Sequence, residues 1–241
     1  MVSADPLQNA FLKSLSPVDF AAIRRHLRAV ELQEGASLIE LGQTVVWAHL
    51  PLTAVVSLVV ELKAGERIEV ALVGSDSILG TFGILGEPVA LVHAVVLVPG
   101  AALLIEVARL RALAQQSVEF RDNLTRHSQA LFVQAQQSVG CNASHTVEAR
   151  LARWLLRVRD LSGRDRFKFT QELMAEMIGV RRNSVSFVAH AFQQANVIRF
   201  SRGHIEIVNA AELNKTTCEC YRAVKMQYKR LGLSTGEESE A

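Results

Sequence analysis

The sequence predicts an α+β chain made of an N-terminal antiparallel β jelly roll, a long helix and a C-terminal winged helix-turn-helix. Three observations support this fold class. Between residues 30 and 105, short runs rich in Val, Leu and Ile alternate with turn residues, which is typical of antiparallel barrels. Residues 109–139 contain neither glycine nor proline, which favours a continuous helix. Two amphipathic segments then flank Gly179, and a short hairpin follows them.

The composition is that of a folded chain with reduced cysteines. Of its 241 residues, 49 % are hydrophobic and 21 % are charged, which suffices for a packed core and argues against disorder. Three cysteines cannot form a disulfide framework, so we expect a cytoplasmic protein. The N-terminal segment lacks a basic stretch followed by an apolar one, and we expect no signal peptide.

The predicted barrel occupies residues 1–107 and begins with short helices over 6–29, where Ser16 and Pro17 form a helix-start pattern. The uncharged run 88–105 is long enough to span a membrane. Pro99 and Gly100 interrupt it, so we interpret it as two strands joined by a turn and expect no membrane contact. The expected strands are 37–39, 45–50, 54–61, 67–73, 92–98 and 101–105.

Residues 108–144 are expected to form the long helix and a hinge. This helix carries a thin apolar stripe on an otherwise polar surface. Because the stripe is too thin to cover a large core, we interpret it as the seam of a two-stranded coiled coil, and therefore of a homodimer. An ordinary amphipathic helix lying on the barrel is the alternative. The stripe consists of Phe120, Leu124, His127, Leu131, Ala135 and Ser138.

Residues 145–212 carry the most specific pattern. Thr170 can cap a first short helix, and Gly179 supplies a tight turn. A second helix is expected from about 182 to 194, and it should bury the stripe Val185, Val188, Ala189 and Phe192. Residues 196–208 read as a hairpin with its tip at 201–204, which is the wing of a winged helix.

The charge is concentrated in the same segment. Residues 146–210 hold 11 basic and 6 acidic side chains, whereas residues 1–145 hold 10 basic and 13 acidic ones. A basic module behind a slightly acidic one indicates a polyanionic partner. A solvated basic face without any partner is the alternative.

The side chains left on the outer face of the second helix suit the edges of DNA bases. Arg binds guanine through O6 and N7, Asn binds adenine, and Phe can contact a thymine methyl group. Serines and backbone amides at the helix start would hold phosphates, as would the wing. A helical hairpin that only packs is the alternative. The expected DNA-contacting residues are Thr170, Arg181, Arg182, Asn183, Ser184, Ser186, Phe187, His190, Arg202 and His204.

The chain resembles the Crp/Fnr family of bacterial transcription regulators over nearly its whole length. The segments that carry the resemblance are 149–156, 170–185 and 198–205, and the tail from Cys218 to Tyr221 resembles that of a subgroup often seen in alphaproteobacteria. The resemblance implies a cyclic-nucleotide-binding-like sensor barrel, a helix-turn-helix domain and no enzymatic activity. It also implies a homodimer on palindromic double-stranded DNA and contact with RNA polymerase. Residues 213–241 would form a C-terminal helix and a disordered acidic tail.

The recognition helix departs from the usual family pattern Ser-Arg-Glu-Thr-Val-x-Arg. Arg182 and the pair Ser184-Val185 are kept, but Asn183 replaces the Glu and Phe187 replaces the second Arg. We therefore expect a half-site that differs from the usual one. Arg181 replaces the capping Ser, and the loss of a cap costs about 0.5–2 kcal/mol unless another group compensates.

The sensor barrel departs further. Cyclic-nucleotide binders of the family carry a Gly-Glu and an Arg-Ser pair, whereas Thr81 stands at the Glu position and no Arg occurs between Arg67 and Arg109. A buried phosphate without a cation is unfavourable, so we expect neither cAMP nor cGMP, no cofactor, and an unknown effector. The expected effector pocket consists of Gly80, Thr81, Phe82, Leu91 and His93.

Other chemistries remain as alternatives. An iron–sulfur cluster needs about four cysteine ligands, and the first 140 residues contain none. Haem ligation by His49 or His93, sensing of another small ligand, and a cupin-type metal enzyme stay open. Cys218 and Cys220 could bind a metal or react, but with no second cysteine pair nearby we interpret them as incidental and expect no metal site.

Overall fold

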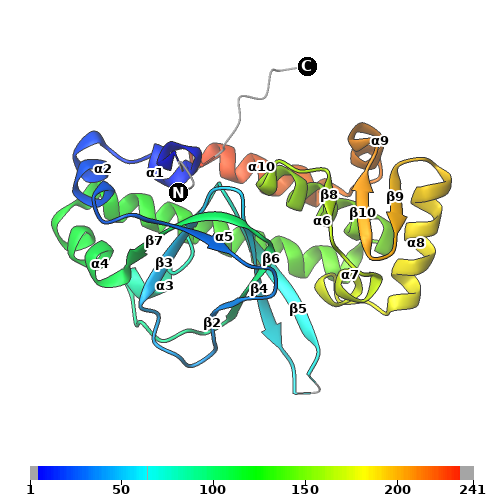
Figure 1. Cartoon of the computed structure of the whole chain (residues 1–241), viewed down its shortest axis with the longest axis horizontal. Helices are drawn as coiled ribbons and strands as arrows, with labels where there is room; N and C mark the ends of the chain where they lie inside the picture. The colour runs from blue at the N-terminus through cyan, green and yellow to red at the C-terminus, as the bar shows by residue number, and fades with distance from the viewer. Residues whose placement is uncertain (1–4, 64, 234–241) are drawn as a thin grey trace.

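The computed structural model describes residues 5–63 and 65–233, and its N-terminal half is an antiparallel β barrel (Figure 1). Both of its sheets are antiparallel throughout, and their orders are β1-β7-β3 and β2-β6-β4-β5. The strands are β1 (Arg28–Leu32), β2 (Ser37–Ile39), β3 (Trp47–Pro51), β4 (Val55–Glu61), β5 (Arg67–Val73), β6 (His93–Val98) and β7 (Gly100–Glu106). The predicted jelly roll is confirmed.

Strand β1 was not predicted. Only Leu32 of its five residues is buried, so the segment lacks the alternation of apolar and polar residues that marks a half-buried strand. The strand forms because its five residues pair with residues 100–104 of β7, which lie about 70 residues away in the sequence. The prediction of helices up to residue 29 therefore extended too far.

Short helices close one end of the barrel. Asn9 caps α1 (Ala10–Lys13), and its side-chain amide donates to the carbonyls of Pro51 and Ser77, which ties the N-terminus to the barrel. The other elements are η1 (Pro6–Gln8), α2 (Pro17–Arg24) and α3 (Thr81–Leu85). As predicted, Ser16 caps α2, and its hydroxyl accepts from the amide of Asp19.

The expected single helix over 109–139 is two helices. Helix α4 (Val107–Gln116) ends at Ser117, whose extended backbone starts α5 (Val118–Ser144). The Ser117 hydroxyl accepts from the amide of Phe120 and donates to the carboxylate of Asp19. A serine can cap a helix or sit within one, and here the contact with α2 selects the cap.

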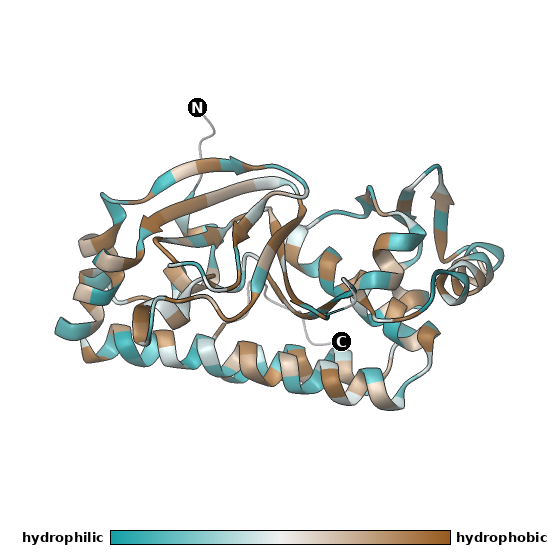
Figure 2. Cartoon of the chain, turned by 90° about the horizontal axis from the view of Figure 1, so that it is seen from below, coloured by the Kyte–Doolittle hydropathy of each residue, from teal (hydrophilic) through white to brown (hydrophobic). Residues whose placement is uncertain are grey.

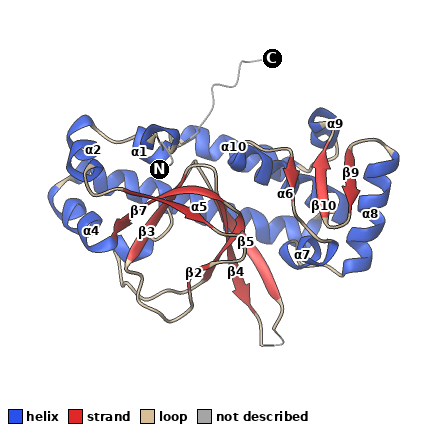
Figure 3. Cartoon of the chain, in the orientation of Figure 1, coloured by secondary structure: helices blue, strands red, loops and turns tan. Residues whose placement is uncertain are grey.

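The C-terminal module is a helix-turn-helix with a three-stranded sheet of order β8-β10-β9 (Figure 3). The hairpin β9–β10 was predicted, and helix α8 begins and ends where it was expected. After the module, the chain returns along α5 as α10 (Glu219–Arg230). The elements of the module are α6 (Val147–Ser162), β8 (Arg166–Phe167), α7 (Gln171–Met177), α8 (Arg182–Gln194), β9 (Ile198–Ser201), β10 (His204–Ile207) and α9 (Ala210–Lys215). The predicted acidic tail lies outside the described residues.

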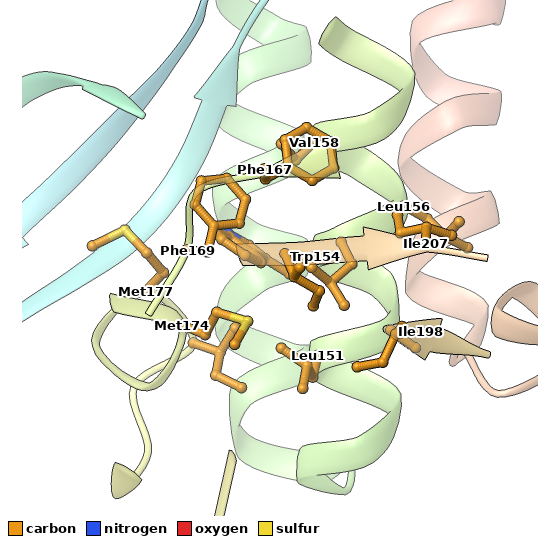
Figure 4. Packing of buried hydrophobic residues seen from close by; sticks show 14 of the residues in the cluster. Leu151, Trp154, Leu156, Val158, Phe167, Phe169, Met174, Met177, Ile198 and Ile207 are labelled. Carbon is orange, nitrogen blue, oxygen red and sulfur yellow. The ribbon is translucent and has the colours of Figure 1, made fainter. Parts of the chain in front are cut away.

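One of the hydrophobic core clusters crosses the boundary between the two halves, beside a second cluster inside the barrel. Leu151 and Trp154 of α6 pack with Met174, Phe169 and the inner face of β10 (Figure 4). The same cluster continues into Val55, Val59 and Leu72 of the barrel and into Leu97 and Val98. A core that crosses the boundary holds the helix-turn-helix module against its own barrel.

The stripe predicted to form the dimer seam faces the chain's own core instead. Phe120, Leu124, His127 and Ser138 are buried within the single chain, and Leu131 and Ala135 are partly buried. The ring of Phe11 packs edge-on against Phe120 and His127, with centroids 5.8 and 4.9 Å away. The N-terminal helices and β5 supply the surface that the sequence did not reveal. The alternative of an amphipathic helix on the barrel therefore describes this stripe.

Polar and apolar turns alternate along α5, which runs beneath the barrel in Figure 2. Its outward side carries Arg121, Thr125, Ser128, Phe132, Ala135 and Val139, which recur at spacings of four and three. Phe132 and Val139 are 63 % and 68 % exposed. This outer stripe is offset by one residue from the predicted one at five of its six positions, and the two stripes share Ala135. No helix of the described residues is long and apolar enough to cross a membrane.

Candidate nucleic-acid interface

The turn between α7 and α8 fixes how the second helix is presented. The hydroxyl of Thr170 caps α7 by accepting from the amide of Leu173 at 3.0 Å. Gly179 then adopts a φ of +63°, a left-handed conformation that favours glycine. The amide of Val180 donates to the carbonyl of Ala175 at 2.9 Å, which closes α7. The sequence pattern predicted both the cap and the glycine turn.

Helix α8 divides its residues between the core and solvent as predicted. Val185, Val188, Ala189 and Phe192 are buried. On the opposite side, Arg182, Asn183 and His190 are exposed, and the Phe187 side chain is 77 % exposed. Phe187 thus lies among polar neighbours on the side of the helix that faces away from the core. The four residues form a continuous outer face, as the predicted DNA contacts require.

The two serines predicted beside this face are half-buried. The Ser186 hydroxyl lies 2.5 Å from the side-chain oxygen of Gln171, so it already joins α8 to α7. The amide of Ser184 donates to the carbonyl of Arg181 within the first turn. The Ser186 hydroxyl therefore has a structural hydrogen bond within the module.

Positive charge surrounds the start of α8. Arg181 is the N-cap residue and makes no side-chain cap bond, so the sequence-based expectation of a missing cap is confirmed. Both Arg181 and Arg182 are exposed. Arg182 Nε lies 3.9 Å from a carboxylate oxygen of Glu172, so these two exposed groups form a long, weak ion pair. Uncapped amides and the positive end of the helix dipole favour an anion at this end.

The wing ends in a tight turn. Arg202 and Gly203 have φ angles of +49° and +77°, as expected for a two-residue hairpin loop. Arg202 and His204 are exposed at its tip, while Glu206 binds Arg166 and Arg199 at 2.8 and 2.9 Å. The hydrogen bond from Arg166 lowers the pKa of Glu206. The tip lies close to the start of α7, because a Cβ built on Gly203 would be 3.7 Å from the side chain of Thr170. Arg202 therefore places its positive charge near this end of α7.

The barrel contains a cavity of about 650 Å³ between α3, β4, β5, the segment 86–92 and α5. Four of the five residues predicted for the effector pocket line it: Gly80, Thr81, Phe82 and Leu91. His93 does not line it, and its Nδ1 lies 2.9 Å from the carboxylate of Glu40. The rest of the lining is largely apolar and includes Leu131 and Phe132 of α5.

No Lys, Arg or His belongs to the lining among the described residues. Arg111 lies nearby, but its guanidinium donates to the carbonyls of Gly83 and Gly86. Burial lowers the pKa of His49, the second histidine considered for haem, to about 4. His49 does not line the cavity either.

The sequence interpretation of Cys218 and Cys220 overlooked two residues far away in the chain. Cys141 and His145, at the end of α5, lie beside the cysteine pair, and the four possible ligand atoms are all within 4.8 Å of one another. The spacing of 77 residues between Cys141 and Cys218 hides this relationship, and no local signal indicates it.

Comparisons with known proteins agree with this architecture. Residues 149–216 match the model of the Crp-like helix-turn-helix domain. Among solved structures, a chain assigned to the Crp/Fnr regulators from Eubacterium rectale is 15 % identical and has a TM-score of 0.68, with 87 % of this chain and 98 % of that chain covered. FixK2 from Bradyrhizobium japonicum is 15 % identical, with a TM-score of 0.66 and coverages of 80 % and 98 %.

A third solved structure is the c-di-GMP responsive global regulator CLP from Xanthomonas campestris. It is 12 % identical, with a TM-score of 0.64 and coverages of 80 % and 99 %. No curated protein matches the chain. The matches do not separate the alphaproteobacterial subgroup from other regulators, so that assignment stays a prediction.

Proposed function

Because the chain has the fold of the Crp/Fnr transcription regulators and carries a Crp-like helix-turn-helix domain, we propose that it binds palindromic operators as a homodimer. Helix α8 enters the major groove and the wing contacts the backbone. The observation that carries this proposal is the exposed face of Arg182, Asn183, Phe187 and His190. It is a regulator and not an enzyme, it acts in the cytoplasm, and it contacts RNA polymerase when bound at a promoter.

Different residues of α8 and the wing contact different parts of the DNA. Arg182 at the helix start can bind guanine in two-point fashion, and Asn183 can do the same with adenine. Phe187 can cover a thymine methyl group. Arg181, Arg202 and His204 neutralise phosphates and set the register of the helix without reading sequence. The half-site therefore contains a guanine, an adenine and a thymine at positions that these side chains reach.

The homodimer pairs through the outer stripe of α5 rather than through the stripe that faces the core. Residues 121, 125, 128, 132, 135 and 139 follow the four-three spacing of a coiled-coil seam. Phe132 and Val139 provide its apolar contacts, since both are exposed in the single chain. Two parallel α5 helices would carry two copies of α8 for the two halves of a palindrome.

The cavity of the barrel takes an uncharged apolar effector. A cyclic nucleotide would bring a buried phosphate to a lining that offers no cation among the described residues, and an unpaired buried charge is strongly unfavourable. Phe132 contributes both to this cavity and to the outer stripe. A ligand that touches Phe132 would therefore change the surface on which the second copy packs.

In vitro selection of random duplexes by the full chain tests the proposal. We expect enrichment of a palindrome with half-site centres about one helical turn, 34–36 Å, apart. The variant Arg182→Ala should lose the preference at one base pair of each half-site, whereas Arg24→Ala, a change of an exposed arginine on α2, should keep the full preference. Failure to enrich any palindrome at moderate salt would contradict the proposal.

A further inference from the structure

The three cysteines of the chain and one of its seven histidines meet at the junction between α5 and α10. Cys141 lies in the last turn of α5, and His145 is the residue that ends this helix. Cys218 is the N-cap of α10, and Cys220 lies in its first turn. We propose that these four residues bind one zinc ion in a tetrahedral Cys₃His site.

The distances within the group fit a single tetrahedral ion. Zinc lies about 2.3 Å from thiolate sulfur and about 2.0–2.1 Å from histidine nitrogen. Ideal tetrahedral angles then place two sulfurs about 3.8 Å apart and a sulfur about 3.5 Å from the nitrogen. In this chain, Cys141 Sγ lies 3.6 Å from Cys218 Sγ, and Cys220 Sγ lies 3.5 Å from His145 Nδ1. Little movement is needed to bring all four atoms onto one ion.

The donor set argues for zinc over an iron–sulfur cluster. A cluster takes about four cysteine ligands spread around several irons, whereas this group has three cysteines with every ligand atom within 4.8 Å of the others. Three thiolates and one imidazole form a closed set of four, which is the pattern of structural zinc sites.

Two neighbouring side chains complete the surroundings of such a site. His145 Nε2 lies 3.2 Å from a carboxylate oxygen of Glu219. Nε2 can therefore donate its proton to Glu219 while Nδ1 binds the ion, which is the usual arrangement of a metal-bound histidine. The side-chain amide of Gln137 donates to Cys220 Sγ at 3.0 Å. Hydrogen bonds of this kind orient ligands and stabilise thiolates.

The position gives the ion a structural role. The chain enters the helix-turn-helix module just after His145 and leaves it just before Cys218. A zinc ion would fasten both ends of the module to the end of α5, along which α10 already packs. Binding of the ion would then stabilise the orientation of the module relative to α5. The metal site itself does not depend on the proposed binding of DNA.

Metal analysis of the full, untagged chain tests the proposal. After exhaustive dialysis we expect one zinc per chain by inductively coupled plasma mass spectrometry. Cobalt exchanged into the site should show the intense thiolate-to-cobalt absorption and the visible bands of tetrahedral coordination. The three thiols should resist alkylation until a chelator removes the ion. Zinc well below one per chain, together with thiols that react equally fast before and after chelation, would overturn the proposal.

Variants identify the ligands. Cys218→Ser and His145→Gln should each weaken zinc binding at least 100-fold, whereas His26→Gln, a matched change in the turn after α2, should leave it unaltered. Glu219→Gln should weaken binding about 10-fold to 100-fold, since it removes only a partner of His145. Unaltered zinc affinity in His145→Gln would overturn the proposed ligand set.

A zinc titration of the chelated wild-type chain separates metal binding from a folding defect in the variants. Hydrogen exchange should slow in residues 141–150 and 217–224 when zinc is added. Equal exchange rates with and without zinc would contradict the proposal that the ion stabilises the module against α5.

Discussion

The indole Nε1 of Trp154 lies 3.1 Å from each carboxylate oxygen of Glu69, and this contact joins the helix-turn-helix module to the barrel. The hydroxyl of Ser57 donates to the same carboxylate at 2.8 Å. Glu69 is buried, and burial raises its pKa from 4.5 to about 7 in spite of both hydrogen bonds. The contact between the two halves therefore contains a group that changes charge near neutral pH.

The first prediction concerns the pH dependence that Glu69 causes. The folded chain keeps the proton up to about pH 7, whereas the unfolded chain releases it near pH 4.5. This contribution to the free energy of unfolding is therefore full below pH 4.5 and falls by up to about 3 kcal/mol as the pH rises to about 7. Urea unfolding of Glu69→Gln should lack this fall, because the amide retains both hydrogen bonds without a charge.

Glu66→Gln is the control, since Glu66 is an exposed carboxylate in the turn before the same strand. It should keep the wild-type pH dependence. The same slope in Glu69→Gln as in the wild type would mean that Glu69 titrates normally.

The second prediction concerns His127, a polar residue in an apolar place. Neither ring nitrogen has a hydrogen-bond partner among the residues that the structure describes, and burial lowers the pKa of His127 from 6.5 to about 3. Between about pH 6.5 and pH 3, the unfolded chain therefore binds a proton at His127 and the folded chain does not. The free energy of unfolding falls as the pH drops through this range. For this residue alone the fall is about 2 kcal/mol at pH 5.

His127→Phe should raise the free energy of unfolding at pH 5 more than at pH 7.5, because a phenyl ring fits against Phe11 and takes up no proton. Urea unfolding at the two pH values measures the difference. His190→Gln, which changes an exposed histidine on α8, is the control and should not alter the pH dependence. If the gain is equal at both values, His127 does not resist protonation.

The third prediction separates the two stripes of α5. Phe132→Glu places a charge on the outer stripe and should convert a dimer to monomers in sedimentation velocity, with little change in thermal stability. Leu131→Glu places the charge against the chain's own core, so its main effect should be a loss of about 2 kcal/mol or more in the free energy of unfolding.

Arg126→Glu is the control, because this residue is exposed on the same helix but lies about a third of a turn away from Phe132. It should remain dimeric. A dimer that survives Phe132→Glu would place the interface on another surface.

These stripes show what the sequence can and cannot predict. The periodicity of α5 identified a helix with an apolar side, but it could not say whether that side meets a partner or the same chain. Phe11 decides the matter, and it is separated from Phe120 by more than a hundred residues. The break at Ser117 likewise depends on Asp19 of another helix. Local patterns carry information about elements, whereas the choice of neighbour depends on tertiary packing.

The candidate DNA-contacting face was more accessible to sequence reasoning because its signals are local. Thr170, Gly179 and the buried stripe of α8 lie within 23 residues and obey helix geometry. The exposed face of α8 then consists of the residues that do not belong to its buried stripe. The group of Cys141, His145, Cys218 and Cys220 is the opposite case. Its members lie in two segments that no short-range pattern relates, so only the path of α10 along α5 brings them together.

The fourth prediction distinguishes base contacts from phosphate contacts. Arg182→Ala should weaken specific binding by about 1–3 kcal/mol and relax one base position of each half-site, because a two-point contact with guanine is lost. Arg202→Ala should weaken binding to all sequences nearly equally and reduce the slope of log affinity against log salt by about one, because the wing neutralises a phosphate. Fluorescence anisotropy at several salt concentrations, with operator and scrambled duplexes, measures both effects. An equal loss on both duplexes for Arg182→Ala would assign Arg182 to the phosphate backbone, and base recognition would then have to rest on Asn183, Phe187 and His190.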